Sequence, residues 1–154
     1  MPALSLKPNR ESYLHLQTIF FFFQEVKINL ANRSELKKYI RSIFKKEGKK
    51  LSTLNCIFCT DKVLLEINRQ YLSHDYYTDI ITFDLSETNT VRADIFISVD
   101  RVKENALQLG TSFKSELHRV IFHGALHLCG YKDKTKAEKE RMRGMEEFYL
   151  TKYC

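Results

Sequence analysis

The sequence has few of the features that mark secreted, membrane or fibrous proteins. Its four cysteines, irregularly spaced among 154 residues, do not form a disulfide scaffold, which favours a reducing, cytoplasmic setting. The longest apolar run, Ile19 to Phe23, is far shorter than the roughly 20 residues that span a bilayer. Lys7 and Arg10 interrupt any signal-peptide pattern before it. Five glycines and two prolines exclude collagen-like and low-complexity classes. We expect a soluble, cytoplasmic protein with no membrane partner.

The composition is that of one globular domain. Hydrophobic residues make up 44% and charged residues 29%, so a chain of this length can bury a core without covalent staples. Lys and Arg outnumber Asp and Glu by 25 to 19, and the net charge of +6 favours an anionic partner without identifying it. Residues 1–18 hold both prolines and show no clear period, so we expect an N-terminal arm there and the folded domain over residues 19–154.

Hydrophobic periodicity predicts four strands and five helices in one α+β domain. The expected strands are Ile19–Ile28, Leu51–Thr60, Asp79–Leu85 and Asp94–Ser98. The expected helices begin at Ser34, Asp61, Asp100, Ser112 and Thr135, where Ser34 and Asp61 are expected N-caps and Thr135-x-x-Glu138 has the capping-box spacing. The pattern places Ile67, Tyr71, Leu109 and Phe148 on inward helix faces.

The helix that begins at Ser112 ends in a motif with metal-binding potential, His123-Gly-Ala-Leu-His127-Leu-Cys-Gly130-Tyr-Lys-Asp133. Two histidines at this spacing lie about 40° apart on one helical face, so both can reach one ion. Gly130 allows a sharp turn that could bring Asp133 to the same ion. Two histidines and a carboxylate with an open position form a catalytic zinc pattern. A histidine pair alone is more often two unrelated helix residues, and the added glycine and carboxylate make the two interpretations about equal.

A zinc protease of the His-Glu-x-x-His kind is the competing interpretation. In such proteases the Glu after the first His is the general base, and here Gly124 holds that position. Without that carboxylate, peptide hydrolysis lacks its proton acceptor. A protease is therefore disfavoured.

Several linked segments resemble the YbeY family of metal-dependent endoribonucleases and ribosomal RNA maturation factors. HGALHLCGYKD is similar to the family signature His-Gly-x-Leu-His-Leu-x-Gly-Tyr-Asp-His, and INRQYLSHDYYTDIITF, ADIFIS and ELHRVIFHG match upstream segments in order and spacing. The resemblance extends from about Ile19 to the C-terminus. It implies an α+β fold with a mixed sheet covered by helices, one zinc-like ion at the end of a central helix, and single-stranded RNA as substrate.

Carried over by residue, the resemblance makes His123 and His127 the first two metal ligands. Asp133 stands where most members have the third His, and it is an acceptable though harder ligand. Leu72 replaces a family Arg that is associated with RNA or phosphate charge, and we hypothesise that Lys132 substitutes for it.

Two further residues are candidates for substrate binding. His74 lies near the segment that lines the family's cleft, although an ordinary polar loop residue is the more frequent explanation. Asp79 faces the cleft in the family, whereas ordinary turn chemistry would have its carboxylate accept from local backbone amides. Basic residues after the motif fit a solvated helix face and phosphate attraction about equally: Lys132, Lys134, Lys136, Lys139, Arg141 and Arg143.

The resemblance predicts a metal-dependent endoribonuclease that processes ribosomal RNA, at the 3′ end of the small-subunit RNA, in association with the ribosome. One divalent ion, with Zn²⁺ favoured, would lower the pKa of a water that attacks the phosphodiester, and no catalytic residue beyond that water is indicated. No DNA partner is expected. Leu72 and Asp133 favour an alternative, a catalytically weak RNA- or ribosome-binding module with a structural metal.

The remaining candidates receive plainer interpretations. Cys56 and Cys59 are expected to be buried strand residues, and Cys129 to fill space in the core. His118 is expected to be a surface or packing residue. Glu116 is expected to complement the helix N-terminus, too far from His123 to reach the ion.

Overall fold

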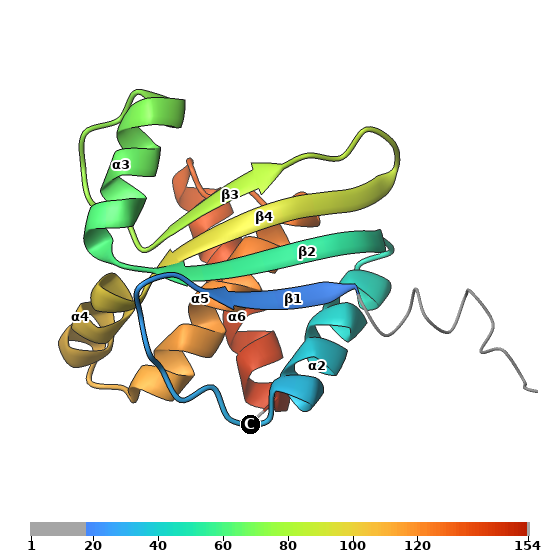
Figure 1. The fold of residues 1–154 in the computed structure, drawn as a ribbon. Helices are drawn as coiled ribbons and strands as arrows, with labels where there is room; N and C mark the ends of the chain where they lie inside the picture. The colour runs from blue at the N-terminus through green and yellow to red at the C-terminus, as the bar shows by residue number, and fades with distance from the viewer. Residues whose placement is uncertain (1–17, 154) are drawn as a thin grey trace, which may run out of the picture.

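The computed structural model describes residues 18–153 as one mixed four-stranded sheet with helices on both faces (Figure 1). Thr18 apart, the expected N-terminal arm lies outside the described residues. The strand order is β1 (Ile19–Phe23), β2 (Lys50–Cys59), β4 (Thr90–Ser98) and β3 (Ile80–Asp84). β1, β2 and β4 run parallel, whereas β3 pairs with β4 in the antiparallel direction. The predicted α+β fold with a mixed sheet is confirmed.

Helices α2, α4, α5 and α6 lie on one side of the sheet, and α3 covers one end of the other side (Figure 1). Their bounds are α2 (Arg33–Lys46), α3 (Asp61–Leu72), α4 (Val99–Leu109), α5 (Phe113–Leu128) and α6 (Lys136–Tyr153). Within the described residues, no helix combines the length and the apolar character that a bilayer span requires.

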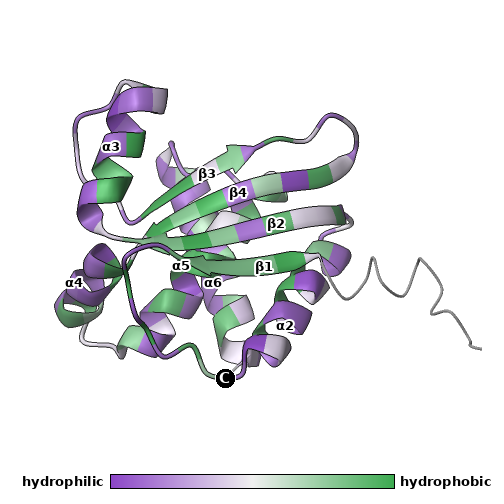
Figure 2. Cartoon of the chain, viewed as in Figure 1, coloured by the Kyte–Doolittle hydropathy of each residue, from purple (hydrophilic) through white to green (hydrophobic). Residues whose placement is uncertain are grey.

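The core lies between the sheet and the four helices. Side chains of a strand alternate between faces, so Leu54, Cys56 and Phe58 of β2 point to the same side and are fully buried. Ile95 and Ile97 of β4 do likewise. Figure 2 shows the corresponding hydrophobic stretches along the strands. The buried strand cysteines that the sequence predicted are confirmed, and burial raises the pKa of the Cys56 thiol to about 12.

Helix α5 packs against the sheet at the point where it carries a glycine. A Cβ built at Gly124 would lie 2.8 Å from Cδ1 of both Ile80 and Ile95, closer than real Cβ atoms approach other atoms. The missing side chain therefore allows α5 to rest directly on β3 and β4. The Cβ of a glutamate at this position, as in the protease motif, would meet the same isoleucines.

Some predicted boundaries differ from the structure. The first strand ends at Phe23 because Glu25 adopts a left-handed backbone conformation with φ 57°. β4 begins four residues earlier than predicted, at Thr90, because it pairs along the full length of β2. Helix α2 starts at Arg33, and its N-cap is Asn32, whose side chain makes no capping hydrogen bond.

Helix α3 is capped by Thr60 and not by Asp61. The Thr60 hydroxyl accepts from the Val63 amide at 3.2 Å. The Asp61 carboxylate is engaged elsewhere, because it accepts from the Ser98 hydroxyl at 2.7 Å and pairs with Arg101 at 2.6 Å. The capping box of α6 is confirmed, with the Glu138 amide donating to Thr135 Oγ1 at 3.1 Å.

Of the inward positions expected in α3, α4 and α6, three are wrong, and Ile67 is only partly buried. Tyr71 and Leu109 are each 64% exposed and Phe148 is 45% exposed. Tyr71 and Leu109 lie in the last turns of α3 and α4, beyond the part of each helix that the core covers. Helix α6 buries Glu146 and Tyr149 beside Met142, so its inward stripe does not include Phe148.

Candidate metal centre

The three predicted ligands converge at the C-terminal end of α5. His123 and His127 lie one turn apart, and Gly130, with φ 103°, turns the chain back so that Asp133 faces them. Asp133 Oδ2 lies 3.4 Å from His123 Nε2 and 3.1 Å from His127 Nε2. One ligand atom from each of the three residues lies within 4.8 Å of the other two.

Both imidazole rings present Nε2 to this point because neighbouring acceptors engage Nδ1. The Nδ1 of His127 lies 2.9 Å from the Tyr131 carbonyl oxygen, and the Nδ1 of His123 lies 2.5 Å from Glu146 Oε1. A carbonyl or carboxylate oxygen accepts from a ring N–H, so these contacts favour the neutral tautomer with hydrogen on Nδ1, in which each Nε2 offers its lone pair to an ion. The orientation needed for a shared ion is thus built into the protein.

A cluster of charged residues lies behind His123. Arg119 donates to Glu116 Oε2 at 2.9 Å and to Glu146 Oε1 at 3.2 Å, and its guanidinium lies 3.9 Å from the Asp79 carboxylate. Hydrogen bonding to Glu116 raises the pKa of Arg119. Three carboxylates around one guanidinium leave surplus negative charge beside the ligands, which suits a cation.

The donor set fits a divalent ion. Two neutral imidazole nitrogens and one carboxylate oxygen are ligands that zinc accepts, and three protein ligands leave a position open. The ligand side chains are 17%, 28% and 41% exposed for His123, His127 and Asp133, so a substrate can approach that position.

The ligands border a hollow of about 680 Å³ between the end of α5 and the segment that links α3 to β3. Of the residues predicted to bind substrate, His74 and Asp79 line this hollow, and so does Leu72. Lys132 does not. The neighbouring basic residue that does line the hollow is Lys134.

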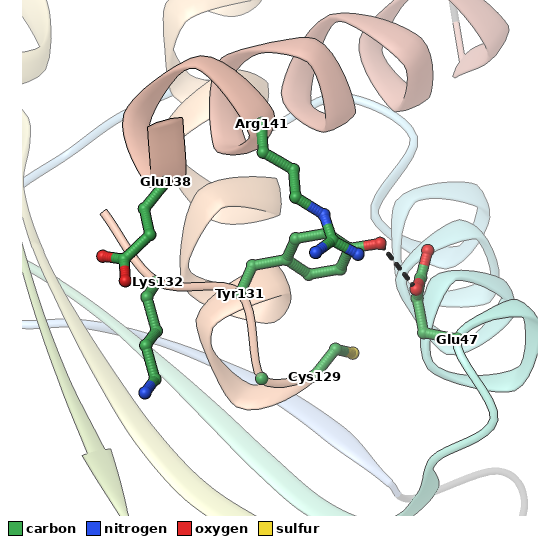
Figure 3. A pocket seen from close by; sticks show the side chains of 7 residues that line it. Glu47, Cys129, Tyr131, Lys132, Glu138 and Arg141 are labelled. Carbon is green, nitrogen blue, oxygen red and sulfur yellow. Dashed lines mark hydrogen bonds between the residues drawn. The ribbon is translucent and has the colours of Figure 1, made fainter. Parts of the chain in front are cut away.

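Lys132 lines a separate hollow of about 330 Å³, shown in Figure 3. There Arg141 lies over the Tyr131 ring, and the Tyr131 hydroxyl donates to Glu47 at 3.0 Å. Lys132 and Lys134 are two residues apart in an irregular segment. Sequence spacing gives no rule for which of them faces the ligands.

Asp79 is held by residues distant in the sequence. Its Oδ2 accepts from Asn105 Nδ2 of α4 at 3.1 Å, a partner that local turn chemistry does not include. Burial raises the pKa of Asp79, and Arg119, His123 and a hydrogen bond from Asp79's own backbone amide, a local contact of the kind that the sequence predicted, partly oppose this effect.

Sequence reasoning missed Arg119 and Glu146, and for Glu116 it expected only a favourable charge at the helix N-terminus. Glu116 is 1% exposed and pairs with Arg119, although the expectation that it stays away from the ligands agrees with its partners. The spacing of Glu116 and Arg119 could have suggested a pair on one helix. No local signal connects Glu146 to His123, which lies 23 residues earlier.

Comparison with known proteins places the chain in a family. The family described as Endoribonuclease YbeY matches residues 21–154. An Endoribonuclease YbeY of Cytophaga hutchinsonii is 52% identical over 136 residues, which cover 88% of this chain and 95% of that protein. One of Parabacteroides distasonis is 44% identical and covers 83% of this chain and 90% of its own. The solution structure of a Thermotoga maritima protein shares the fold with a TM-score of 0.61 and 26% identity, over 88% of this chain and 89% of that one. The chain belongs to the YbeY family.

Proposed function

We propose that this protein is a metal-dependent endoribonuclease that hydrolyses single-stranded RNA. The observation that carries the proposal is the convergence of His123 Nε2, His127 Nε2 and Asp133 Oδ2 beside an open hollow. Relatives that match nearly all of the chain bear the name endoribonuclease, and the excess of basic residues suits a polyanionic substrate.

The chain's own residues divide the work of such a site. His123, His127 and Asp133 would hold the ion, and zinc is favoured by the two imidazoles. When bound, a divalent ion supplies a lowered pKa for a water molecule and positive charge opposite the phosphodiester oxygens. Asp79 lines the same hollow, and its raised pKa suits a carboxylate that takes up a proton. Lys134 offers a cation to an approaching phosphate.

The resemblance to the YbeY family extends the proposal to the substrate and its setting. We propose that the RNA is ribosomal, with the 3′ end of the small-subunit RNA as the processed segment. The protein would then act in the cytoplasm on or near the ribosome. His74, exposed at the rim of the hollow, is the proposed contact for a substrate nucleotide.

A second candidate is an RNA- or ribosome-binding module whose ion is structural. The observation that favours it is Leu72, which lines the hollow with 41% of its surface exposed at the position of the family arginine. A leucine offers no positive charge to a phosphoryl oxygen. In this second candidate function, the protein binds the ion and RNA but does not cleave the RNA.

The test measures metal content and RNA cleavage on the same samples. Zinc-loaded full-length protein should bind one ion by elemental analysis and cleave a fluorophore-labelled single-stranded RNA. His123→Ala and His127→Ala should lose the ion, and cleavage should fall by about 100-fold or more because the ligands act as a unit. Asp133→Ala should also lose the ion, whereas Asp133→His should keep it, since imidazole is an equally good zinc ligand.

Each result separates the candidates. Metal binding and RNA binding without cleavage support the binding module. Equal cleavage by the parent and by His123→Ala identifies a contaminating nuclease and overturns the proposed activity. A parent protein that takes up no divalent ion overturns the metal site itself.

A further inference from the structure

We infer that Glu146 is a positioning residue for His123, and that Arg119 holds Glu146 in place. The inference rests on the proposed metal site. It assigns to helix α6, which contributes none of the three ligands, a part in determining how strongly the site holds an ion.

Glu146 contacts the ring of the proposed ligand His123. Glu146 Oε1 lies 2.5 Å from His123 Nδ1. A carboxylate oxygen accepts from a ring N–H, so this contact favours the tautomer with hydrogen on Nδ1. The hydrogen on Nδ1 leaves the Nε2 lone pair free, and Nε2 is the atom that lies 3.4 Å from Asp133 Oδ2. Glu146 thus selects the tautomer that can bind an ion and aims it at the other ligands.

The side chain of Glu146 has few other orientations. Its side chain is 7% exposed, and both of its oxygens accept from Arg119 Nη1, at 3.2 and 3.4 Å. Arg119 is itself anchored by Glu116, which is 1% exposed. A buried carboxylate with two cationic or hydrogen-donating partners keeps its place, so the ring that it contacts keeps its orientation as well.

The two ligand histidines differ in what orients their rings. His127 is oriented by a backbone atom, the carbonyl oxygen of Tyr131, which side-chain substitution leaves in place. His123 is oriented by a side chain from another helix. Removal of the Glu146 carboxylate should therefore affect one ligand and leave the other aimed at the site.

The experiment compares zinc affinity in the parent, Glu146→Gln, Glu146→Ala and the control Glu147→Gln. Glu147 is the next residue of the same helix and is exposed. Zinc dissociation constants come from competition with a chromophoric chelator. Loss of such a partner weakens metal binding by about 10–100-fold, which we expect for Glu146→Ala. Glu146→Gln keeps an oxygen that can accept from Nδ1, so its affinity should lie between those of Glu146→Ala and the parent. Glu147→Gln should match the parent.

A second measurement separates positioning from a general effect on stability. The ¹⁵N shifts of the His123 ring in the zinc-free protein report which nitrogen carries the hydrogen. The parent should show hydrogen on Nδ1, and Glu146→Ala should shift the population toward Nε2, while the His127 signals stay unchanged. Circular dichroism establishes that each variant is folded, and Glu146→Gln, which keeps the side-chain volume, provides the reading if Glu146→Ala does not fold.

Two results would overturn the inference in different ways. If the parent binds zinc and both Glu146 variants bind it equally well with an unchanged His123 tautomer, Glu146 does not position the ligand, and the metal site stands. If the parent binds no zinc, the metal site and the role of Glu146 fall together.

Discussion

At the scale of single residues, the site depends on which side chains an irregular segment turns toward the ligands. Tyr131 to Thr135 connect α5 to α6 without regular structure. Asp133 and Lys134 of this segment line the hollow beside the histidines, and Lys132 lines the other one. The role of Lys132 as a substitute for the family arginine stays a prediction, and the geometry favours Lys134 for the same task.

The two lysines can be compared directly. We expect Lys134→Ala to weaken binding of single-stranded RNA and to reduce the dependence of log K on log[salt] by about 0.7, the value for one phosphate contact on a single strand. Lys132→Ala should bind RNA like the parent, because its side chain faces a different hollow. Fluorescence anisotropy over a series of KCl concentrations measures both quantities. A loss confined to Lys132→Ala would instead support the sequence-based hypothesis.

At the scale of elements, α5 serves both the core and the site. Its N-terminus is capped by Ser112, whose hydroxyl accepts from the Ser115 amide at 3.0 Å, and ten of its sixteen residues are buried. His123 and His127 lie on its partly exposed side, while Gly124 lies on the side that touches β3 and β4. Close packing at Gly124 determines how near the ligands lie to the sheet edge at Asp79 and Ile80.

Alanine substitutions at two helical glycines test this packing. Alanine favours a helix over glycine by about 1 kcal/mol, so Gly144→Ala, with open space around its Cβ, should raise the free energy of unfolding by up to about 1 kcal/mol. Gly124→Ala should lower it by about 1 kcal/mol, since overpacking costs about 1–3 kcal/mol and outweighs the same helical gain. Urea unfolding measures both changes.

A second substitution, Ile95→Val, tests whether the clash at Gly124 causes this loss of stability. Ile95→Val removes one of the two Cδ1 atoms that the new Cβ would meet. In the Ile95→Val variant, Gly124→Ala should therefore lower the free energy of unfolding by less than it does in the parent. If Gly124→Ala stabilises the protein as much as Gly144→Ala does, α5 does not pack this closely on the sheet.

At the scale of the whole molecule, α6 is fastened to parts of the chain that are distant in sequence. The Tyr149 hydroxyl donates to Glu47 at 2.5 Å, and the Tyr131 hydroxyl donates to the other oxygen of the same carboxylate. Tyr39 donates to the Tyr149 carbonyl oxygen. These bonds hold α6 against α2 and α5, and so bring Glu146 to His123.

His118 connects this packing to pH. It is 2% exposed, stacks near Phe122 and meets the edge of Tyr153, and its Nδ1 has no hydrogen-bond partner among residues 18–153. Burial, aided by Lys114, lowers the pKa of His118 from 6.5 to about 4. Between these values the unfolded chain binds a proton that the folded chain does not. Stability is therefore complete above about pH 6.5 and decreases as the pH falls toward 4.

The expected size of this effect is on the order of 2–3 kcal/mol at pH 4. His118→Phe keeps a ring and removes the titrating group. The difference in the free energy of unfolding between parent and variant should be constant above pH 7 and shift in favour of the variant as the pH falls. A His118→Phe profile parallel to that of the parent would contradict the prediction.

Much of the fold follows from local patterns in the sequence. The order of strands and helices, the capping box at Thr135 and the buried strand cysteines were all predictable, because side-chain alternation and capping depend on neighbours within a few residues. The boundaries of the strands and helices were less predictable. Glu25 takes a left-handed conformation with no glycine to mark it, and Thr90 joins β4 only because a partner strand lies beside it.

The cluster of His123, His127 and Asp133 follows from local sequence, because a four-residue helical spacing and a glycine turn bring the three side chains together within one short segment. What orients His123, and whether Lys132 or Lys134 lines the hollow of about 680 Å³ beside it, depends on tertiary packing. Glu146 reaches the ring from a helix 23 residues away, through packing of α6 on α5 that no local period encodes. An irregular segment such as that around Lys132 and Lys134 has no repeat that could reveal its inward side.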